Sequence, residues 1–98
     1  MKGKLIYVDI DGTICTSEED YSLSKPVVSH ISKINKLFDE GNRIVYYTAR
    51  GQRSGKDWSD LTKNQLKDWG CKYHDLIMNH KPPYDLLICD KTKRIEEI

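Results

Sequence analysis

The sequence lacks the features of several protein classes. Its 98 residues contain no apolar run that approaches the length of a membrane span. Lysine and arginine (16) nearly balance aspartate and glutamate (15), and a net charge of +1 gives no basis for strong attraction to nucleic acid or to a membrane surface. The three cysteines form no C-x-x-C pair, so neither a zinc site nor a disulfide framework is indicated. We expect a cytoplasmic protein with reduced thiols.

The length and composition indicate one small folded domain. A chain of 98 residues suffices for a single domain, residues 1–98, with one core. The apolar content of 38% and the charged content of 32% indicate a compact sheet with solvated helices. Residues 1–4 lead directly into a strand pattern that ends in an acid, which is not the pattern of a signal peptide.

The most informative stretch is LIYVDIDGT, residues 5–13. An apolar run that ends in a turn signal is typical of a buried parallel strand, which places Asp9 at the carboxyl end, where open α/β sheets bind ligands. Two acids that flank Ile10 would repel each other there unless a cation such as Mg²⁺ offsets their charge or one acid stays protonated. A carboxylate can also attack phosphorus, and Gly12 allows a sharp turn close to an anion. The alternative is an ordinary strand followed by an Asp-Gly turn.

The rest of the chain alternates between helix and strand patterns. Residues 14–25 are polar and aperiodic and predict a loop over the strand end, with Tyr21 as a candidate pocket residue. The expected helices cover 26–40 and 57–69, and the expected strands cover 43–48, 75–79 and 85–89. Strand, helix and strand in succession predict a right-handed parallel crossover. The turn between the last two strands is too short for a regular crossover, so one of them should be irregular, offset or antiparallel.

The two expected helices each have a predicted buried face. In the first, Ser24 is a plausible cap and His30 is expected to be structural, and the apolar stripe comprises Val27, Val28, Ile31, Ile34, Leu37 and Phe38. In the second, both tryptophans are expected to be core anchors, and the shared face comprises Trp58, Leu61 and Trp69, with Leu66 at its margin.

Polar residues follow the second expected strand at the same edge of the sheet. Thr48 ends that strand, so it should lie near Asp9, where a hydroxyl can donate to a phosphate oxygen. Residues 49–56 add three basic residues and two glycines, a composition that suits a phosphorylated substrate. Arg50 is the best placed of the three, and the other two fit a solvated loop equally well.

In chain order, the D-x-D-G-T stretch at 9–13, Thr48, Lys81 and Asp90 resemble the four motifs of the haloacid dehalogenase-like superfamily of phosphohydrolases. Residues 81–91 are also similar to small capless phosphatases of bacterial capsule and surface-sugar synthesis. The resemblance implies an α/β fold, a Rossmann-like three-layer sandwich with a mostly parallel sheet and flanking helices. Neither gap between the first three motifs has room for a cap domain, so we expect a capless enzyme.

The resemblance also implies a mechanism, Mg²⁺-dependent hydrolysis of a phosphomonoester through an aspartyl-phosphate. Asp9 would be the nucleophile, and Asp11 the general acid and then base. Magnesium would bind the Asp9 carboxylate, the Asp11 carbonyl and Asp90. The implied phosphate-binding residues are Gly12, Thr13, Thr48, Ala49, Arg50 and Lys81, with Lys91 as the local cation in place of Lys81 if the chain is antiparallel there. Cys89 stands where the family usually has a second acid, which weakens a second metal or water-mediated contact.

Several partners and functions stay open at this point. The resemblance favours a sugar phosphate, with a nucleic-acid end or nucleotide phosphatase and a non-catalytic phosphate-binding or regulatory module as alternatives. The basic loop permits nucleic acid, and the near-zero net charge disfavours it. A response-regulator receiver domain is disfavoured because both leading acids flank Ile10. An uncapped site suits a large substrate such as a polymer end, or closure by neighbouring subunits of a homo-oligomer.

Overall fold

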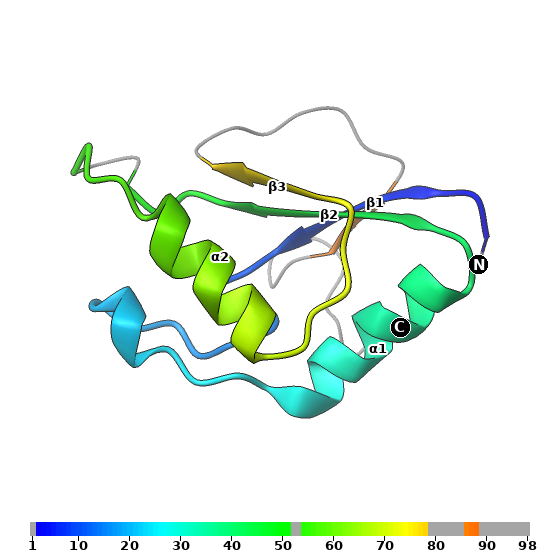
Figure 1. The fold of residues 1–98 in the computed structure, drawn as a ribbon, viewed down its shortest axis with the longest axis horizontal. Helices are drawn as coiled ribbons and strands as arrows, with labels where there is room; N and C mark the ends of the chain where they lie inside the picture. Colours follow the sequence, from blue (N-terminus) through cyan, green and yellow to red (C-terminus); the bar gives the residue numbers. More distant parts are fainter. Residues whose placement is uncertain (1, 52–53, 79–85, 89–98) are drawn as a thin grey trace.

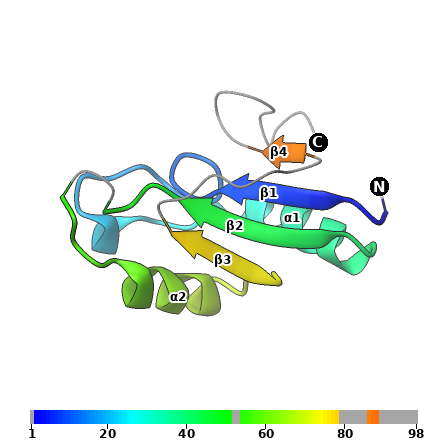
Figure 2. The same ribbon diagram turned by 90° about the horizontal axis from the view of Figure 1, so that it is seen from above.

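A computed structural model of the chain describes residues 2–51, 54–78 and 86–88. The strands are β1 (Leu5–Asp9), β2 (Arg43–Thr48), β3 (Asp75–Met78) and β4 (Leu86–Ile88). The helices are η1, a short 3-10 helix (Tyr21–Leu23), α1 (Val28–Asp39) and α2 (Ser59–Asp68). The strands form one sheet in the order β3-β2-β1-β4, and every pairing is parallel (Figure 2). The predicted α/β class with a parallel sheet is therefore confirmed.

Both α-helices cover the same face of the sheet (Figure 1). This follows from the topology, because the crossovers from β1 to β2 and from β2 to β3 step in the same direction and right-handed connections then fall on one side. Between these strands the described residues hold only η1, α1 and α2, with no cap domain. They form two of the three expected layers, a sheet and one helical layer. No helix in these ranges is long and apolar enough to cross a membrane.

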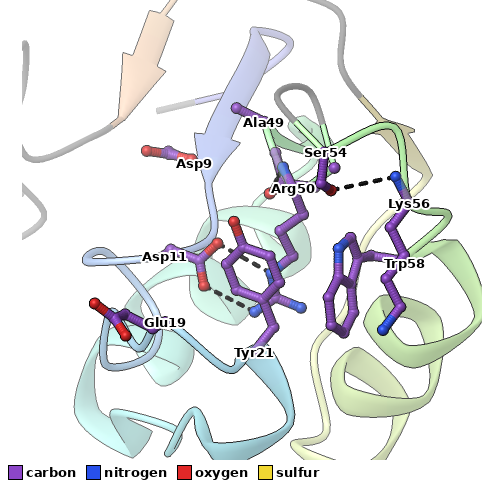
Figure 3. A pocket seen from close by; sticks show the side chains of 11 residues that line it. Asp9, Asp11, Glu19, Tyr21, Ala49, Arg50, Ser54, Lys56 and Trp58 are labelled. Atoms are coloured by element: carbon purple, nitrogen blue, oxygen red, sulfur yellow. Dashed lines mark hydrogen bonds and ion pairs between the residues drawn. The ribbon is translucent and has the colours of Figure 1, made fainter.

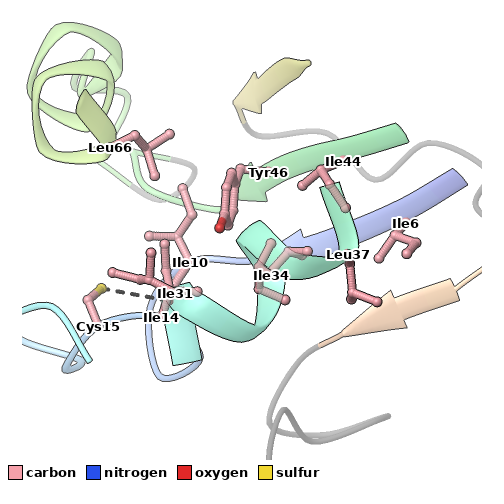
Figure 4. Close-up of a cluster of buried hydrophobic side chains, with 11 residues drawn as sticks. Ile6, Ile10, Ile14, Cys15, Ile31, Ile34, Leu37, Ile44, Tyr46 and Leu66 are labelled. Atoms are coloured by element: carbon pink, nitrogen blue, oxygen red, sulfur yellow. Dashed lines mark hydrogen bonds between the residues drawn. The ribbon is translucent and has the colours of Figure 1, made fainter. Parts of the chain in front are cut away.

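The core lies between the sheet and the two helices (Figure 4). Alternate residues of β1 and β2 point toward the helices, as the period of two in a strand requires. The buried apolar cluster comprises Ile6, Val8, Ile10, Ile14, Cys15, Ile31, Ile34, Leu37, Ile44, Tyr46 and Leu66. Ile10 belongs to this cluster, so the chain just beyond β1 is anchored to the core at this residue.

Helix α1 begins two residues later than the sequence pattern predicted. Thr16 donates its backbone N–H to Lys25 O at 2.9 Å, and Val27 donates to Ile14 O at 2.8 Å. This pairing keeps the residues before the helix extended, so Val27 is the N-cap residue and Ser24 does not cap the helix. Val28 was predicted to join the apolar stripe, but it is 69% exposed, because the helix start turns it away from the sheet.

The buried face of α2 also differs from the predicted one. Leu66, placed at the margin, is fully buried, and the other buried residues of this helix are the polar Thr62 and Gln65. Trp69 packs against the core cluster as expected. The apolar periodicity could not reveal the correct face, because two of the three residues that this helix buries are polar.

Strands β3 and β4 lie on opposite edges of the sheet, and each is parallel to its neighbour. The antiparallel alternative for this part of the chain is therefore wrong. The strands contain four and three residues, and seven residues separate them in the sequence.

Candidate functional site

A cavity of about 660 Å³ opens at the carboxyl ends of β1 and β2 (Figure 3). Five of the predicted site residues line it, namely Asp9, Asp11, Thr48, Ala49 and Arg50. The further lining residues are Glu19, Tyr21, Gly51, Ser54, Lys56 and Trp58. Asp9 pairs with Tyr47 in the sheet register, so Thr48 lies one residue beyond it at the same edge. The order of the strands reverses beside β1, which is where open α/β sheets bind ligands.

The two acids are held by the short segment that ends β1. Asp9 is the last residue of the strand, and its Oδ1 accepts the Ile10 N–H at 2.9 Å. Ile10 is buried in the core, so Asp9 and Asp11 flank an anchored residue. Gly12 then adopts φ +82°, a left-handed conformation that favours glycine, and turns the chain back. The predicted convergence of Asp9 and Asp11 on one cavity is therefore observed.

Arg50 forms a bidentate ion pair with Asp11. Its Nη2 lies 2.8 Å from Asp11 Oδ1, and its Nε lies 3.0 Å from Oδ2. The side chain of Arg50 is 0% exposed, whereas that of Asp11 is 19% exposed. Charge-assisted bidentate pairs of this kind fix orientation as well as adding energy. The carboxylate of Asp11 is therefore held in one position at the cavity wall.

The remaining donors of Arg50 are also used inside the protein. Nη1 donates to Gln65 Oε1 at 2.6 Å and to Thr62 Oγ1 at 3.1 Å, and Nη2 also approaches Cys15 Sγ at 4.0 Å. A guanidinium has five N–H donors, and these contacts with the Asp11 pair account for all of them. The prediction that Arg50 binds substrate phosphate is therefore corrected: in this structure it orients Asp11.

Thr48 and Ala49 lie where the sequence placed them, at the end of β2. Thr48 is buried, lines the cavity, and its Oγ1 accepts the Arg50 backbone N–H at 3.1 Å. A threonine hydroxyl can accept this bond and still donate its own hydrogen to an oxygen in the cavity. Ala49 is exposed at the rim.

Gly12 and Thr13 do not line the cavity, contrary to the prediction. The Gly12 N–H donates to Cys15 O at 3.0 Å, and Thr13 donates its N–H to Ile10 O at 3.1 Å. The Thr13 side chain is buried at 1% exposure, and its carbonyl accepts a hydrogen bond from His30 Nδ1 at 2.8 Å. The tight turn after Asp11 uses these amides for its own bonds. The contact also agrees with a structural role for His30.

The residues of the third and fourth motifs lie outside the described residues. Asp90, Lys81 and Lys91 therefore stay predictions, as does the effect of Cys89.

Of the predicted magnesium ligands, the structure describes Asp9 and Asp11. Mg²⁺ takes oxygen ligands and is often held by one or two carboxylates plus substrate phosphate. The Asp9 carboxylate lines the cavity and fits this requirement. Both carboxylate oxygens of Asp11 accept bonds from Arg50, so its backbone carbonyl is the expected ligand. In the ranges that the structure describes, no three His, Cys, Asp or Glu side chains are grouped to hold a metal on their own.

The outer wall of the cavity contains aromatic side chains. The Tyr21 and Trp58 ring centroids are 4.9 Å apart, and the ring planes meet at 89°. Tyr21 was a candidate pocket residue, and it does line the cavity. Trp58 was predicted to be a core anchor, but it is half-buried and lines the cavity, because it lies just before α2 begins. No signal in the sequence indicated this, because the expected helix over 57–69 included Trp58, whereas α2 begins at Ser59.

Comparison with known proteins supports the fold. A search with protein-family models finds no match, and a search of curated proteins finds no significant one. A structural-genomics target from Vibrio cholerae has a crystal structure that resembles this chain with a TM-score of 0.71 and 25% sequence identity. The similarity covers 84% of this chain and 72% of that one. The chain thus shares the small parallel α/β fold of that protein.

Proposed function

We propose that the protein is a Mg²⁺-dependent phosphomonoester hydrolase of the haloacid dehalogenase-like type. The observation that carries this proposal is the position of Asp9 and Asp11, which flank a core residue at the end of β1 and line one cavity with Thr48. A carboxylate at the mouth of a buried strand is a suitable nucleophile toward phosphorus, because substrate can approach it from the cavity side.

The two acids have different surroundings, which suits different roles. Asp9 attacks phosphorus and becomes the aspartyl-phosphate. As the P–O bond to the leaving group breaks, Asp11, oriented by Arg50, gives a proton to the leaving oxygen. Asp11 then takes a proton from the water that attacks the aspartyl-phosphate, which releases phosphate and frees Asp9. Thr48 donates its hydroxyl hydrogen to a phosphate oxygen, and Mg²⁺, when bound by Asp9 and the Asp11 carbonyl, would neutralise charge on the phosphoryl group.

The proposed substrate is a sugar phosphate. The sequence resemblance favours a sugar phosphate, and the cavity is large enough for a whole small molecule, since ligand pockets commonly measure about 300–1,000 Å³. One alternative is a nucleic-acid end or nucleotide phosphatase, which a panel of sugar, nucleotide and DNA-end phosphates would identify. The other is a phosphate-binding or regulatory module without turnover, which is an outcome of the experiment below.

The test is hydrolysis of an aryl phosphate with Mg²⁺ and with a chelator, in wild type and in Asp9→Asn. Phosphate release should require Mg²⁺ and fall by about three orders of magnitude or more in the variant. Asp68→Asn is the matched control, because it removes an exposed acid at the end of α2 and should retain activity. Near-normal release by Asp9→Asn would refute the assigned nucleophile. Binding of phosphate without any release by wild type would favour the binding module.

A further inference from the structure

The Tyr21–Trp58 corner has no part in the chemistry proposed above. The two rings meet almost at a right angle and line the same cavity as Asp9 and Asp11 (Figure 3). Tyr21 comes from η1 and Trp58 from the residue before α2, so the corner joins two segments that are far apart in the sequence. Aromatic rings in a cavity wall supply flat apolar area next to polar chemistry.

Each ring of the corner has a cation on one face. The Arg50 guanidinium carbon lies 4.8 Å from the Tyr21 centroid, and Lys56 Nζ lies 4.4 Å from the Trp58 centroid. Gln65 Nε2 also donates to the backbone carbonyl of Tyr21 at 2.7 Å. These contacts fix the rings before any ligand binds, which lowers the entropy cost of stacking against them. They also disfavour a second cation in the corner.

The volume of the cavity exceeds what a phosphoryl group alone requires. At about 660 Å³ it lies in the middle of the range for pockets that enclose whole small molecules. If the phosphoryl group lies at Asp9, the rest of the substrate must occupy the remaining part of the cavity, whose wall includes Tyr21 and Trp58.

We propose that the Tyr21–Trp58 corner binds the flat face of a ring in the leaving group of the substrate. The proposal rests on the proposed function, because it takes the phosphoryl group to lie at Asp9. The ring belongs to a sugar, which presents a C–H face to an aromatic side chain, or to a nucleobase, which presents a planar π face. The polar rim residues Glu19 and Lys56 would meet the hydroxyl or amino groups at the ring edge.

Kinetics with three phosphate monoesters test the corner. The substrates are glucose 6-phosphate, adenosine 5′-monophosphate and the acyclic glycerol 3-phosphate. Trp58→Leu should raise the KM of at least one ring substrate relative to the acyclic one by about 5- to 100-fold, the range expected for loss of one stacking contact. Trp58→Phe keeps a flat ring and should recover most of the difference. Trp69→Leu, a tryptophan change at the core, is the matched control and should leave the ratio unchanged.

A binding measurement separates failure of the corner from failure of the proposed function. The chain has two tryptophans, so Trp69→Phe leaves Trp58 as the only indole. In Asp9→Asn/Trp69→Phe, Trp58 fluorescence should respond to the ring phosphates at concentrations at least fivefold below those needed for glycerol 3-phosphate. If wild type hydrolyses none of the esters but the fluorescence response is still selective for ring phosphates, the corner binds rings and the proposed hydrolase function is wrong.

Hydrolysis without ring selectivity would refute ring binding at the corner and leave the proposed function standing. If wild type hydrolyses all three esters, and Trp58→Leu changes their KM values equally or not at all, the ring does not bind at the corner. The ring substrate whose KM rises more in Trp58→Leu shows whether the corner prefers a sugar or a nucleobase. If Trp58→Leu does not fold, the fluorescence titration still decides, because it uses the native Trp58.

Discussion

Replacing Arg50 by methionine should destabilise the protein strongly. The substitution keeps an apolar stem and removes the guanidinium that pairs with Asp11 and donates to Gln65 and Thr62. Breaking a buried ion pair costs about 3–5 kcal/mol, and the 19% exposure of Asp11 argues for the lower end, because water reaches its carboxylate. We expect a loss of about 3 kcal/mol from a total of about 5–15 kcal/mol.

Urea denaturation followed by circular dichroism measures this loss. With a slope of about 1–3 kcal/mol/M, the midpoint should fall by about 1–3 M. Lys56→Met is the control, because it removes an exposed cation over Trp58 and should cost less than about 1 kcal/mol. In a double-mutant cycle, Arg50→Met and Asp11→Asn together should cost less than the sum of the single changes. A loss below about 1 kcal/mol in Arg50→Met would show that the pair is not held as described.

Two further predictions concern residues next to the site. Gly51 has φ +85°, and an added Cβ would lie 2.2 Å from the Lys56 carbonyl oxygen, so Gly51→Ala should lower the melting temperature far more than Gly55→Ala, where the Cβ would meet nothing within 4 Å. Burial raises the pKa of the Cys15 thiol to about 12, so at pH 9 alkylation at Cys15, located by peptide mass spectrometry, should be much slower in the folded protein than in urea. Equal melting temperatures, or equal alkylation rates, would contradict them.

The sequence predicted the edge of the sheet where the cavity lies, because strand ends are a backbone property. Asp9 and Thr48 each follow an apolar run, and parallel pairing brings the ends of such runs together. The same reasoning located both crossover helices between their strands. Their starts were less accurate, because pairing of Val27 with Ile14 lies outside any local pattern.

The role of Arg50 could not be predicted in this way. A basic residue after a strand that faces a phosphate site looks like a ligand, and its actual partners are Asp11 from β1's end and Gln65 from α2. Neither contact follows from the spacing of residues along the chain. From sequence alone, a glutamine in a helix is expected to be exposed, whereas Gln65 is buried and accepts a hydrogen bond from Arg50. The polar face of α2 therefore became visible only when the tertiary contacts were known.

The error over Trp58 has the same origin and a functional consequence. A tryptophan in register with Leu61 is expected to face the core, but Trp58 is the N-cap residue of α2 and so lies outside the helical stripe. Because Arg50 takes the buried position beside Gln65, its guanidinium also supports Tyr21, the other half of the corner. The ion pair that orients Asp11 and the surface offered to a ring are thus parts of one network, and Arg50→Met should weaken both together.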